Sequence, residues 1–182
     1  YEERRKVLDG EDLQEHVQHM IRTVVTGEIA AGMAEHHPEN DKDLQEILAP
    51  MAKLFPCELH YTADELRKLT PDALADAVYD CAMKAYAARE ETFGLQPDGT
   101  PLMRELERVV MLRVVDEYWM DHLEAMDDLR QGIGLRAYGN VKPVDEYKRA
   151  GFDMFDEMVN GIQSETVRRL FTVRVRREQK LE

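Results

Sequence analysis

The amino-acid sequence predicts an all-α fold: a long first helix and a long antiparallel two-helix hairpin, with a small helical insert between them. Three observations lead to this prediction. Apolar residues recur at steps of three and four over long stretches, which is the period of an amphipathic helix. Glycine and proline are few, 10 and 7 among 182 residues, so long helices are permitted. No stretch alternates apolar and polar residues as a half-buried strand would.

The first predicted helical region covers residues 1–37. Asp9-Gly10 is expected to kink or restart the helix, with Asp9 or Asp12 as the N-cap. Residues 36–40, His-His-Pro-Glu-Asn, are expected to interrupt the helical pattern. The apolar stripe of this region consists of Val7, Leu8, Leu13, Val17, Met20, Ile21, Val24, Val25 and Ile29.

Residues 38–101 are predicted to hold several shorter helices followed by a turn-rich link. One helix is expected over residues 41–55. Thr62-Ala-Asp-Glu65 fits a capping box, and Thr70 followed by Pro71 fits an N-cap with proline at the first helical position. Residues 94–101 form the predicted link. The helix after Thr70 carries the stripe Leu74, Val78, Cys81, Ala82, Ala85 and Tyr86.

Residues 102–131 and 144–176 are predicted to be two long helices, each about 45 Å in length at 1.5 Å per residue. Two stripes of matched length joined by a short loop imply an antiparallel hairpin. Gly132-Ile-Gly134 is interpreted as a turn, and Pro143 suits the first turn of the second helix. The stripes are Leu112, Val115, Trp119, Leu123, Met126 and Leu129, and then Tyr147, Gly151, Phe155, Met158, Ile162, Thr166, Leu170 and Val173.

The charge distribution limits the classes of partner. The formal net charge of −13 argues against non-specific binding to nucleic acid, because phosphate contacts need clustered Lys and Arg. The charge is uneven: residues 129–149 carry five bases and two acids, and residues 164–182 carry six bases and three acids. An anionic partner could therefore dock at the hairpin loop or at the C-terminal end.

The cysteines and the start of the sequence indicate the cellular compartment and whether the chain is a fragment. Cys57 and Cys81 lie far apart and form no C-x-x-C, so no disulfide framework is expected and the chain is interpreted as cytosolic. No apolar run approaches the roughly 18 residues of a membrane span. No signal peptide is recognised at the start, Tyr-Glu-Glu-Arg-Arg-Lys. Because the sequence opens without Met and within a helical pattern, it is interpreted as a fragment of a larger protein.

No enzymatic activity is expected of this sequence alone, because familiar catalytic motifs are not found in it. There is no G-x-x-x-x-G-K-[ST] for nucleotide phosphates and no H-E-x-x-H for zinc. A di-iron bundle needs Glu-x-x-His, and no glutamate stands three residues before a histidine. His16 and His19 share a helical face, but two imidazoles without a third ligand favour ordinary histidines over a metal site.

Two features of the hairpin leave alternatives open. Glu117, Asp121, Glu124 and Asp128 form an acidic stripe, which is either a solvated face or an electrostatic partner for a basic surface on a neighbouring domain. Trp119 is interpreted as a core residue rather than a ligand contact. The methionines of the hairpin are also interpreted as core, although they could line an adaptable groove: Met111, Met120, Met126, Met154 and Met158.

The hairpin loop is the most informative segment. Leu135-Arg-Ala-Tyr-Gly139 lies where the chain must turn, and turns lie on the surface. Tyr138 could fold back over the hairpin as a lid. It could instead present an amphipathic ring to a partner, a role that aromatic residues serve well.

The hairpin residues resemble the C-terminal helical region of the SecA family. Tyr1-x-x-Arg4-x-x-x-Leu8-x-Gly10 is also similar to the end of that family's long scaffold helix. The resemblance is dense over residues 104–160 and extends to 1–37, whereas for 38–100 it rests mainly on placement. The matching hairpin positions are Met111-Leu-x-x-x-Asp116-x-x-Trp119-x-x-His122-Leu-x-x-Met126-Asp-x-Leu-Arg-Gln-Gly-Ile-x-Leu-Arg136-x-Tyr138, Pro143, Glu146-Tyr-Lys-Arg149 and Phe152-x-Met-Phe155.

The resemblance implies a layout and a function. Residues 1–37 would be part of a helical scaffold, 38–101 a helical wing domain, and 102–182 a two-helix finger and a return scaffold helix. SecA proteins are the ATP-driven motors of bacterial protein export, so the chain would lie in the cytoplasm, peripherally at the cytoplasmic face of the inner membrane. The implied partners are the SecY channel complex, an unfolded preprotein and the motor domains of the parent chain. ATP and Mg would belong to that motor, and no cofactor is expected here.

The resemblance also assigns the finger tip, which would contact the channel and the translocating polypeptide. The tip tyrosine is Tyr138, and Ala137 stands where the family more often has glycine, which would stiffen the loop. The tip residues are Leu135, Arg136, Ala137, Tyr138 and Gly139. Basic residues near the tip could meet acidic lipid headgroups or channel loops: Arg130, Arg136, Lys142, Lys148 and Arg149.

The alternative function is a stand-alone helical scaffold or adaptor that binds a partner through its hairpin. A Walker-type motor upstream in the reading frame would favour the SecA-like function, and a start codon near Tyr1 would favour the adaptor. A third class, a metal-dependent bundle enzyme, lacks the necessary ligands, and metal analysis of the pure protein would test it.

Overall fold

The fold is all-α, as the sequence predicts. The computed structural model describes residues 2–9, 13–35, 41–55, 64–65, 68–136 and 142–174. These residues form no named strand, and their helices are α1 (Glu2–Leu8), α2 (Gln14–Glu35), α3 (Asp41–Leu54), α5 (Pro71–Phe93), α6 (Leu102–Arg136) and α7 (Pro143–Thr172).

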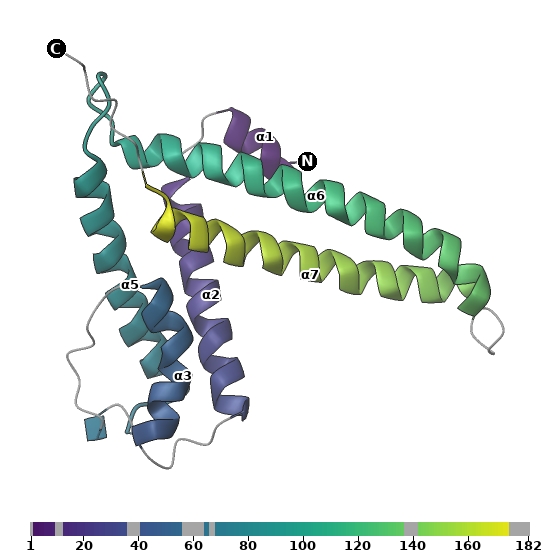
Figure 1. Ribbon diagram of the computed structural model, residues 1–182, viewed down its shortest axis with the longest axis horizontal. Coiled ribbons are helices and arrows are strands. Elements are labelled where there is room, and N and C mark those ends of the chain that lie inside the picture. The colour runs from purple at the N-terminus through teal and green to yellow at the C-terminus, as the bar shows by residue number, and fades with distance from the viewer. Residues whose placement is uncertain are drawn as a thin grey trace.

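Two groups of helices make up the molecule (Figure 1). Helices α2, α3 and α5 pack together as one group, called the block below, with α2 in contact with both α3 and α5. Helices α6 and α7, called the hairpin below, lie side by side and extend away from the block. Helix α1 packs on α6. The C-terminal end of α7 contacts α2.

The core lies where the block meets the base of the hairpin. The stripe on α2 is confirmed, since Val17, Ile21 and Val25 are fully buried. Phe55 packs edge-on against Phe171 of α7, with ring centroids 4.8 Å apart. Full burial of each large apolar side chain contributes about 1.5–3 kcal/mol, so these contacts hold α7 firmly to the block.

The signals that were predicted around α5 are confirmed. The side chain of Thr70 accepts a hydrogen bond from the backbone N–H of Ala73 at 3.2 Å, and Pro71 occupies the first helical position. The link that follows turns at Gly94 and Gly99, whose φ angles of 75° and 88° favour glycine.

The interruption near Asp9 is also confirmed, because α1 ends at Leu8 and α2 begins at Gln14. The capping box at Thr62 and the break at residues 36–40 fall largely or wholly outside the described residues.

The prediction of a turn at Gly132–Gly134 is wrong. Both glycines lie inside α6, which continues to Arg136. Glycine in a helix costs about 1 kcal/mol relative to alanine, an amount that the flanking helical residues can offset. Ile133 is half-buried, so the apolar stripe continues past the predicted end of the helix.

The expectation that the cysteines form no disulfide framework is also corrected. Cys81 on α5 is buried and disulfide-bonded, and no free cysteine occurs among the described residues. The other cysteine of the sequence, Cys57, falls in a part of the chain that is not described. Sequence spacing failed here because tertiary packing, and not separation along the chain, decides which thiols meet.

The outer half of the hairpin is less buried than the sequence predicts. Leu123 and Phe155, both assigned to the core stripes, are 47% and 45% exposed. Trp119 is half-buried rather than enclosed. Two helices alone can cover only the strip between them, and no third described element covers this half of the hairpin. The fully buried residues of α6 and α7 therefore gather at the base, and they include Met103, Val114, Val167 and Leu170.

Candidate interaction site on the hairpin

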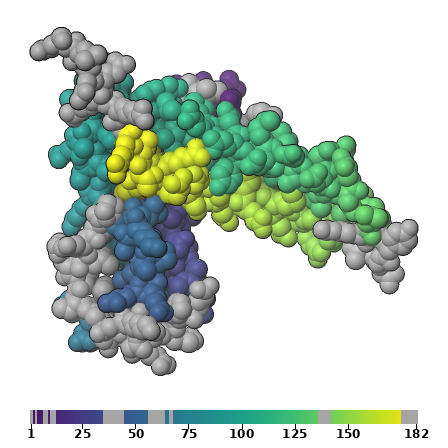
Figure 2. Space-filling view, in the orientation of Figure 1, coloured from purple at the N-terminus to yellow at the C-terminus, as the bar shows by residue number. Residues whose placement is uncertain are grey.

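The hairpin is a pair of long helices in close contact. Helix α6 has 35 residues and α7 has 30. Gly161 allows the helices to approach, because a Cβ at this position would lie 2.4 Å from Cε1 of Tyr118. Gly151 lies against Met126 in the same way, with a Cβ-to-Cε distance of 3.1 Å. Figure 2 shows the hairpin extending from the block as a solid bar.

Ion pairs hold the base of the hairpin on two sides. Arg4 of α1 binds Asp116 of α6, with Nε 2.8 Å from Oδ1 and Nη2 3.4 Å from Oδ2. The next residue, Glu117, receives Arg169 of α7, with Nη2 2.6 Å from Oε2. Arg4 and Asp116 both belong to the family-like sequence pattern, and the structure brings them together across 112 positions.

Hydrogen bonds from arginines lower the pKa values of two acids of the hairpin, Asp116 and Glu165. The hydrogen bond from Arg4 lowers the pKa of Asp116. Hydrogen bonds from Arg168, and then from Arg169, lower the pKa of Glu165 to about 2. Asp116 and Glu165 therefore stay negatively charged at neutral pH and can keep their ion pairs with the arginines.

Partly exposed aromatic and apolar side chains lie along the outer half of the hairpin. The rings of Trp119 and His122 are 5.6 Å apart, and the rings of His122 and Phe155 are 6.0 Å apart. Phe152 and Met120 are 66% and 65% exposed. Exposed large apolar residues in such number are typical of a surface that contacts another molecule or domain.

The acidic stripe on α6 has two parts. Glu117 is bound to Arg169 and belongs to the base of the hairpin. Asp121, Glu124 and Asp128 are exposed on the outer half. Both alternatives for these three acids, a solvated face and a partner for a basic surface, remain compatible with that exposure.

The structure describes only part of the predicted tip. Leu135 is 79% exposed, the most exposed of the large apolar residues that the structure describes. Arg136 is the last residue of α6, and nothing is described of its side chain. Ala137, Tyr138 and Gly139 lie outside the described residues. The choice between Tyr138 as a lid and Tyr138 as a contact residue therefore stays a prediction.

Four of the basic residues near the tip have described side chains, and all four are exposed: Arg130, Lys142, Lys148 and Arg149. Arg130 and Arg149 have acidic partners. Arg130 pairs with Asp127 at 3.2 Å, and Arg149 pairs with Glu146 at 2.8 Å. The exposed pair between Arg130 and Asp127 contributes about 0.2–1 kcal/mol, so an external anion could displace the acid. Lys142 precedes α7 as its N-cap residue without a side-chain cap bond, and Lys148 is exposed on α7.

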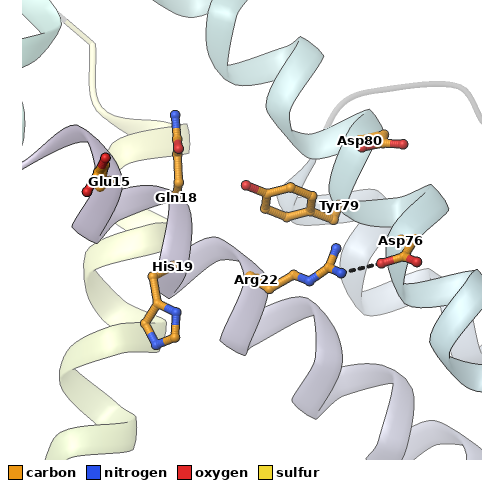
Figure 3. A pocket seen from close by; sticks show the side chains of 7 residues that line it. All are labelled: Glu15, Gln18, His19, Arg22, Asp76, Tyr79 and Asp80. Atoms are coloured by element: carbon orange, nitrogen blue, oxygen red, sulfur yellow. Dashed lines mark hydrogen bonds and ion pairs between the residues drawn. The ribbon is translucent and has the colours of Figure 1, made fainter.

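A groove between α2 and α5 was not predicted from the sequence (Figure 3). Arg22 lies at its centre, bound to Asp76 and stacked over the ring of Tyr79 at 4.8 Å. The polar face of α2 was visible in the sequence, but its pairing with the polar face of α5 was not. The lining residues are Glu15, Gln18, His19, Arg22, Asp76, Tyr79 and Asp80.

The described residues hold neither a candidate metal site nor a helix that could span a membrane. Among those residues, no three His, Cys, Asp or Glu side chains gather where they could hold a metal ion. His16 is half-buried and His19 is exposed. In the same part of the chain, no helix is both long and apolar enough to span a membrane.

Comparison with known proteins gives one consistent result. Residues 1–174 match the family model described as the SecA Wing and Scaffold domain. The chain is 42% identical over 176 residues to the protein translocase subunit SecA of Clostridium novyi. It is 45% identical over 176 residues to the SecA subunit of Frankia casuarinae and 42% identical over 187 residues to that of Streptomyces coelicolor.

These alignments cover nearly all of the chain and a small part of its relatives. They span 96%, 96% and 100% of the chain, but 20%, 18% and 19% of the three relatives. The chain therefore corresponds to about one fifth of the length of the curated proteins that it matches.

Proposed function

The chain belongs to the SecA Wing and Scaffold domain family, and from that premise we propose that its hairpin is the polypeptide- and channel-contacting finger of a SecA-type protein translocase. In this proposal, residues 1–37 belong to the scaffold and 38–101 form the wing domain. Residues 102–182 form the finger and a return scaffold helix. The work of the finger is mechanical, and ATP and Mg are bound by motor domains of the longer protein.

The observation that carries this proposal is the shape of the hairpin. Its two helices extend from the block and end in a tip where Leu135 is 79% exposed (Figure 1). A 30-residue helix is about 45 Å long, enough to carry a contact far from the core that anchors it. An apolar or aromatic tip suits an unfolded polypeptide of any sequence, because such contacts do not select a charge pattern.

The sides of the hairpin support contacts with the motor domains. Met120 and Phe152 are large apolar residues left open to solvent, and the exposed acids Asp121 and Glu124 lie on α6. A neighbouring domain with an apolar surface and a basic rim would cover such a face. This contact would let the hairpin regulate ATP hydrolysis, which the proposal assigns to the motor.

The basic residues near the tip support a second contact, with acidic channel loops or anionic lipid at the cytoplasmic face of the inner membrane. Each basic residue close to such a surface contributes about 1 kcal/mol to binding. Arg136→Glu should therefore weaken association with channel-containing membranes, and the loss should shrink as salt rises. Lys53→Glu, in the block, is the matched control. An Arg136→Glu protein that binds as tightly as the unchanged protein would remove this part of the proposal.

The tip itself is tested by protein export. Tyr138→Ser should reduce translocation of a preprotein into membrane vesicles, and Tyr138→Phe should retain most of it, because the ring supplies the contact. ATP hydrolysis without preprotein should stay unchanged in both variants. Equal export by Tyr138→Ser and the unchanged protein would contradict the proposed role of the tip.

A further inference from the structure

One turn of α5 contacts both helices of the hairpin at its base. Tyr86, Arg89 and Glu90 lie within residues 86–90, beside the start of α6 and the end of α7 (Figure 1). These contacts are polar and directional, unlike the apolar packing around them. We refer to the group below as the α5 joint; it comprises Tyr86, Arg89, Glu90, Arg104 and Glu107.

The joint holds α6 through a buried acid. Glu107 is fully buried, and the hydroxyl of Tyr86 donates a hydrogen bond to its Oε1 at 2.5 Å. Arg104 binds the same carboxylate, with Nη1 2.9 Å from Oε1, and also pairs with Glu90 of α5. A buried carboxylate is costly unless it is paired and hydrogen-bonded, so loss of either partner would disturb the start of α6.

The hydroxyl of Tyr86 stays protonated at ordinary pH values. Burial raises the pKa of Tyr86, and the negative charge of Glu107 raises it further. The hydroxyl therefore remains a donor to the carboxylate throughout the pH range in which the protein would be studied.

The joint holds α7 through its last carbonyls. Nε of Arg89 donates to the carbonyl of Leu170 at 3.1 Å, and its Nη2 donates to the carbonyl of Val173. Because α7 ends at Thr172, these carbonyls lack the partners that a continuing helix would supply. The positive guanidinium also lies at the negative end of the helix dipole.

From this geometry we propose that Tyr86, Arg89 and Glu107 are positioning residues through which α5 sets the direction of the hairpin, so that movement of the wing is transmitted to the hairpin tip. A rotation of about 10° at the joint would displace the far end of a helix about 45 Å long by roughly 8 Å. The proposal concerns how the hairpin is held, and it stands whatever molecule the tip contacts.

The test measures the distance between α5 and the hairpin in the full-length protein. Spin labels carried by non-natural amino acids at Asp72, near the start of α5 and far from the joint, and at Asp128, both exposed, report the distance distribution by pulsed electron paramagnetic resonance. The unchanged protein should give one narrow distribution. Arg89→Gln and Glu107→Gln should broaden it or shift its mean, by up to about 4 Å if the hairpin turns by about 10°.

Two further variants keep the test decisive. Glu105→Gln removes an exposed ion pair with Arg108 on the same helix and should leave the distribution unchanged. Tyr86→Phe removes one hydroxyl but keeps the ring that lies 5.5 Å from Phe171, so it preserves packing if the other variants fail to fold. A lower melting temperature with an unchanged distance distribution in Tyr86→Phe would show a purely stabilising role and overturn the proposal.

Discussion

At the scale of single residues, Gly161 permits the close approach of the two hairpin helices, because it has no Cβ to meet Tyr118. Gly161→Ala should destabilise the protein by about 1–3 kcal/mol, because the new methyl group would overpack against the ring of Tyr118. Urea denaturation of the purified protein measures the difference. Gly132→Ala is the matched control, because no atom of the described residues, apart from the adjoining helix backbone, lies within 4 Å of a Cβ there. In a helix this change should stabilise by roughly 0.5–1 kcal/mol. Gly161→Ala protein as stable as the unchanged protein would contradict the described packing.

Glu165 makes a pH-dependent contribution to stability. Its pKa falls from 4.5 to about 2 in the folded state, chiefly through the hydrogen bond from Arg168. A folded-state pKa below the unfolded value means that the stabilisation is complete above about pH 4.5 and is lost as the pH falls toward 2.

Glu165→Gln should therefore lower the free energy of unfolding by about 0.3–1 kcal/mol at neutral pH, and the two proteins should converge near pH 2. Thermal unfolding across this range measures the difference. A difference between the proteins that does not change with pH would count against the assigned pKa shift.

Sequence reasoning at this scale recovered the helix cap at Thr70 but not the contacts between distant residues. Thr70 and Pro71 were predictable because a cap is decided by neighbours within four positions. Arg4 and Asp116 were both noted in the sequence pattern, yet nothing local states that they meet. Glu107 was missed because a charged residue on a helix is usually exposed, and only tertiary packing encloses it.

At the scale of elements, α1 depends on α6 for its order. Helix α1 packs on α6, and the pair between Arg4 and Asp116 joins the two helices. Arg4→Gln should raise the rate of amide hydrogen exchange in residues 2–8, by up to about fivefold if the pair with Asp116 contributes up to about 1 kcal/mol. Hydrogen–deuterium exchange read by mass spectrometry gives the rates.

The control for α1 lies in the same helix. Arg5 pairs with Asp9 at 3.8 Å and does not reach α6 through that pair. Arg5→Gln should change the exchange of residues 2–8 much less than Arg4→Gln. Equal effects of the two variants would mean that helix propensity, and not the contact with α6, sets the order of α1.

The helices themselves were largely predictable, and their exposure was not. The stripes of α2 and α5 are buried as expected, because three- and four-residue periodicity reports which face is apolar. The same periodicity on the outer half of the hairpin wrongly predicted a core. Periodicity identifies an apolar face but not whether a further layer covers it. The glycines at 132 and 134 were wrongly predicted to form a turn. The low helix propensity of glycine is a weak effect, and the flanking helical residues outweigh it.

At the scale of the whole molecule, the structure separates an anchored base from a projecting outer half. The base of the hairpin is buried against α2 and tied to α1 and α5. The outer half exposes Met120, Leu123 and Phe152. Such an arrangement suits a part whose contacts lie in other domains or other molecules. The family was recognisable from the sequence because its pattern is dense in the hairpin, whereas the tip loop and its contacts were not determined by the same pattern.

The most direct test of the account is a crosslink from the hairpin tip. A photo-reactive amino acid at position 138 of the full-length protein would be activated on membranes with a stalled export substrate and ATP. Asp98, exposed in the link after α5, gives the control position. The account predicts crosslinks to the substrate or the channel from position 138 and none from position 98. Crosslinks from position 138 that form only within the protein itself would contradict it and leave the hairpin with a scaffolding role.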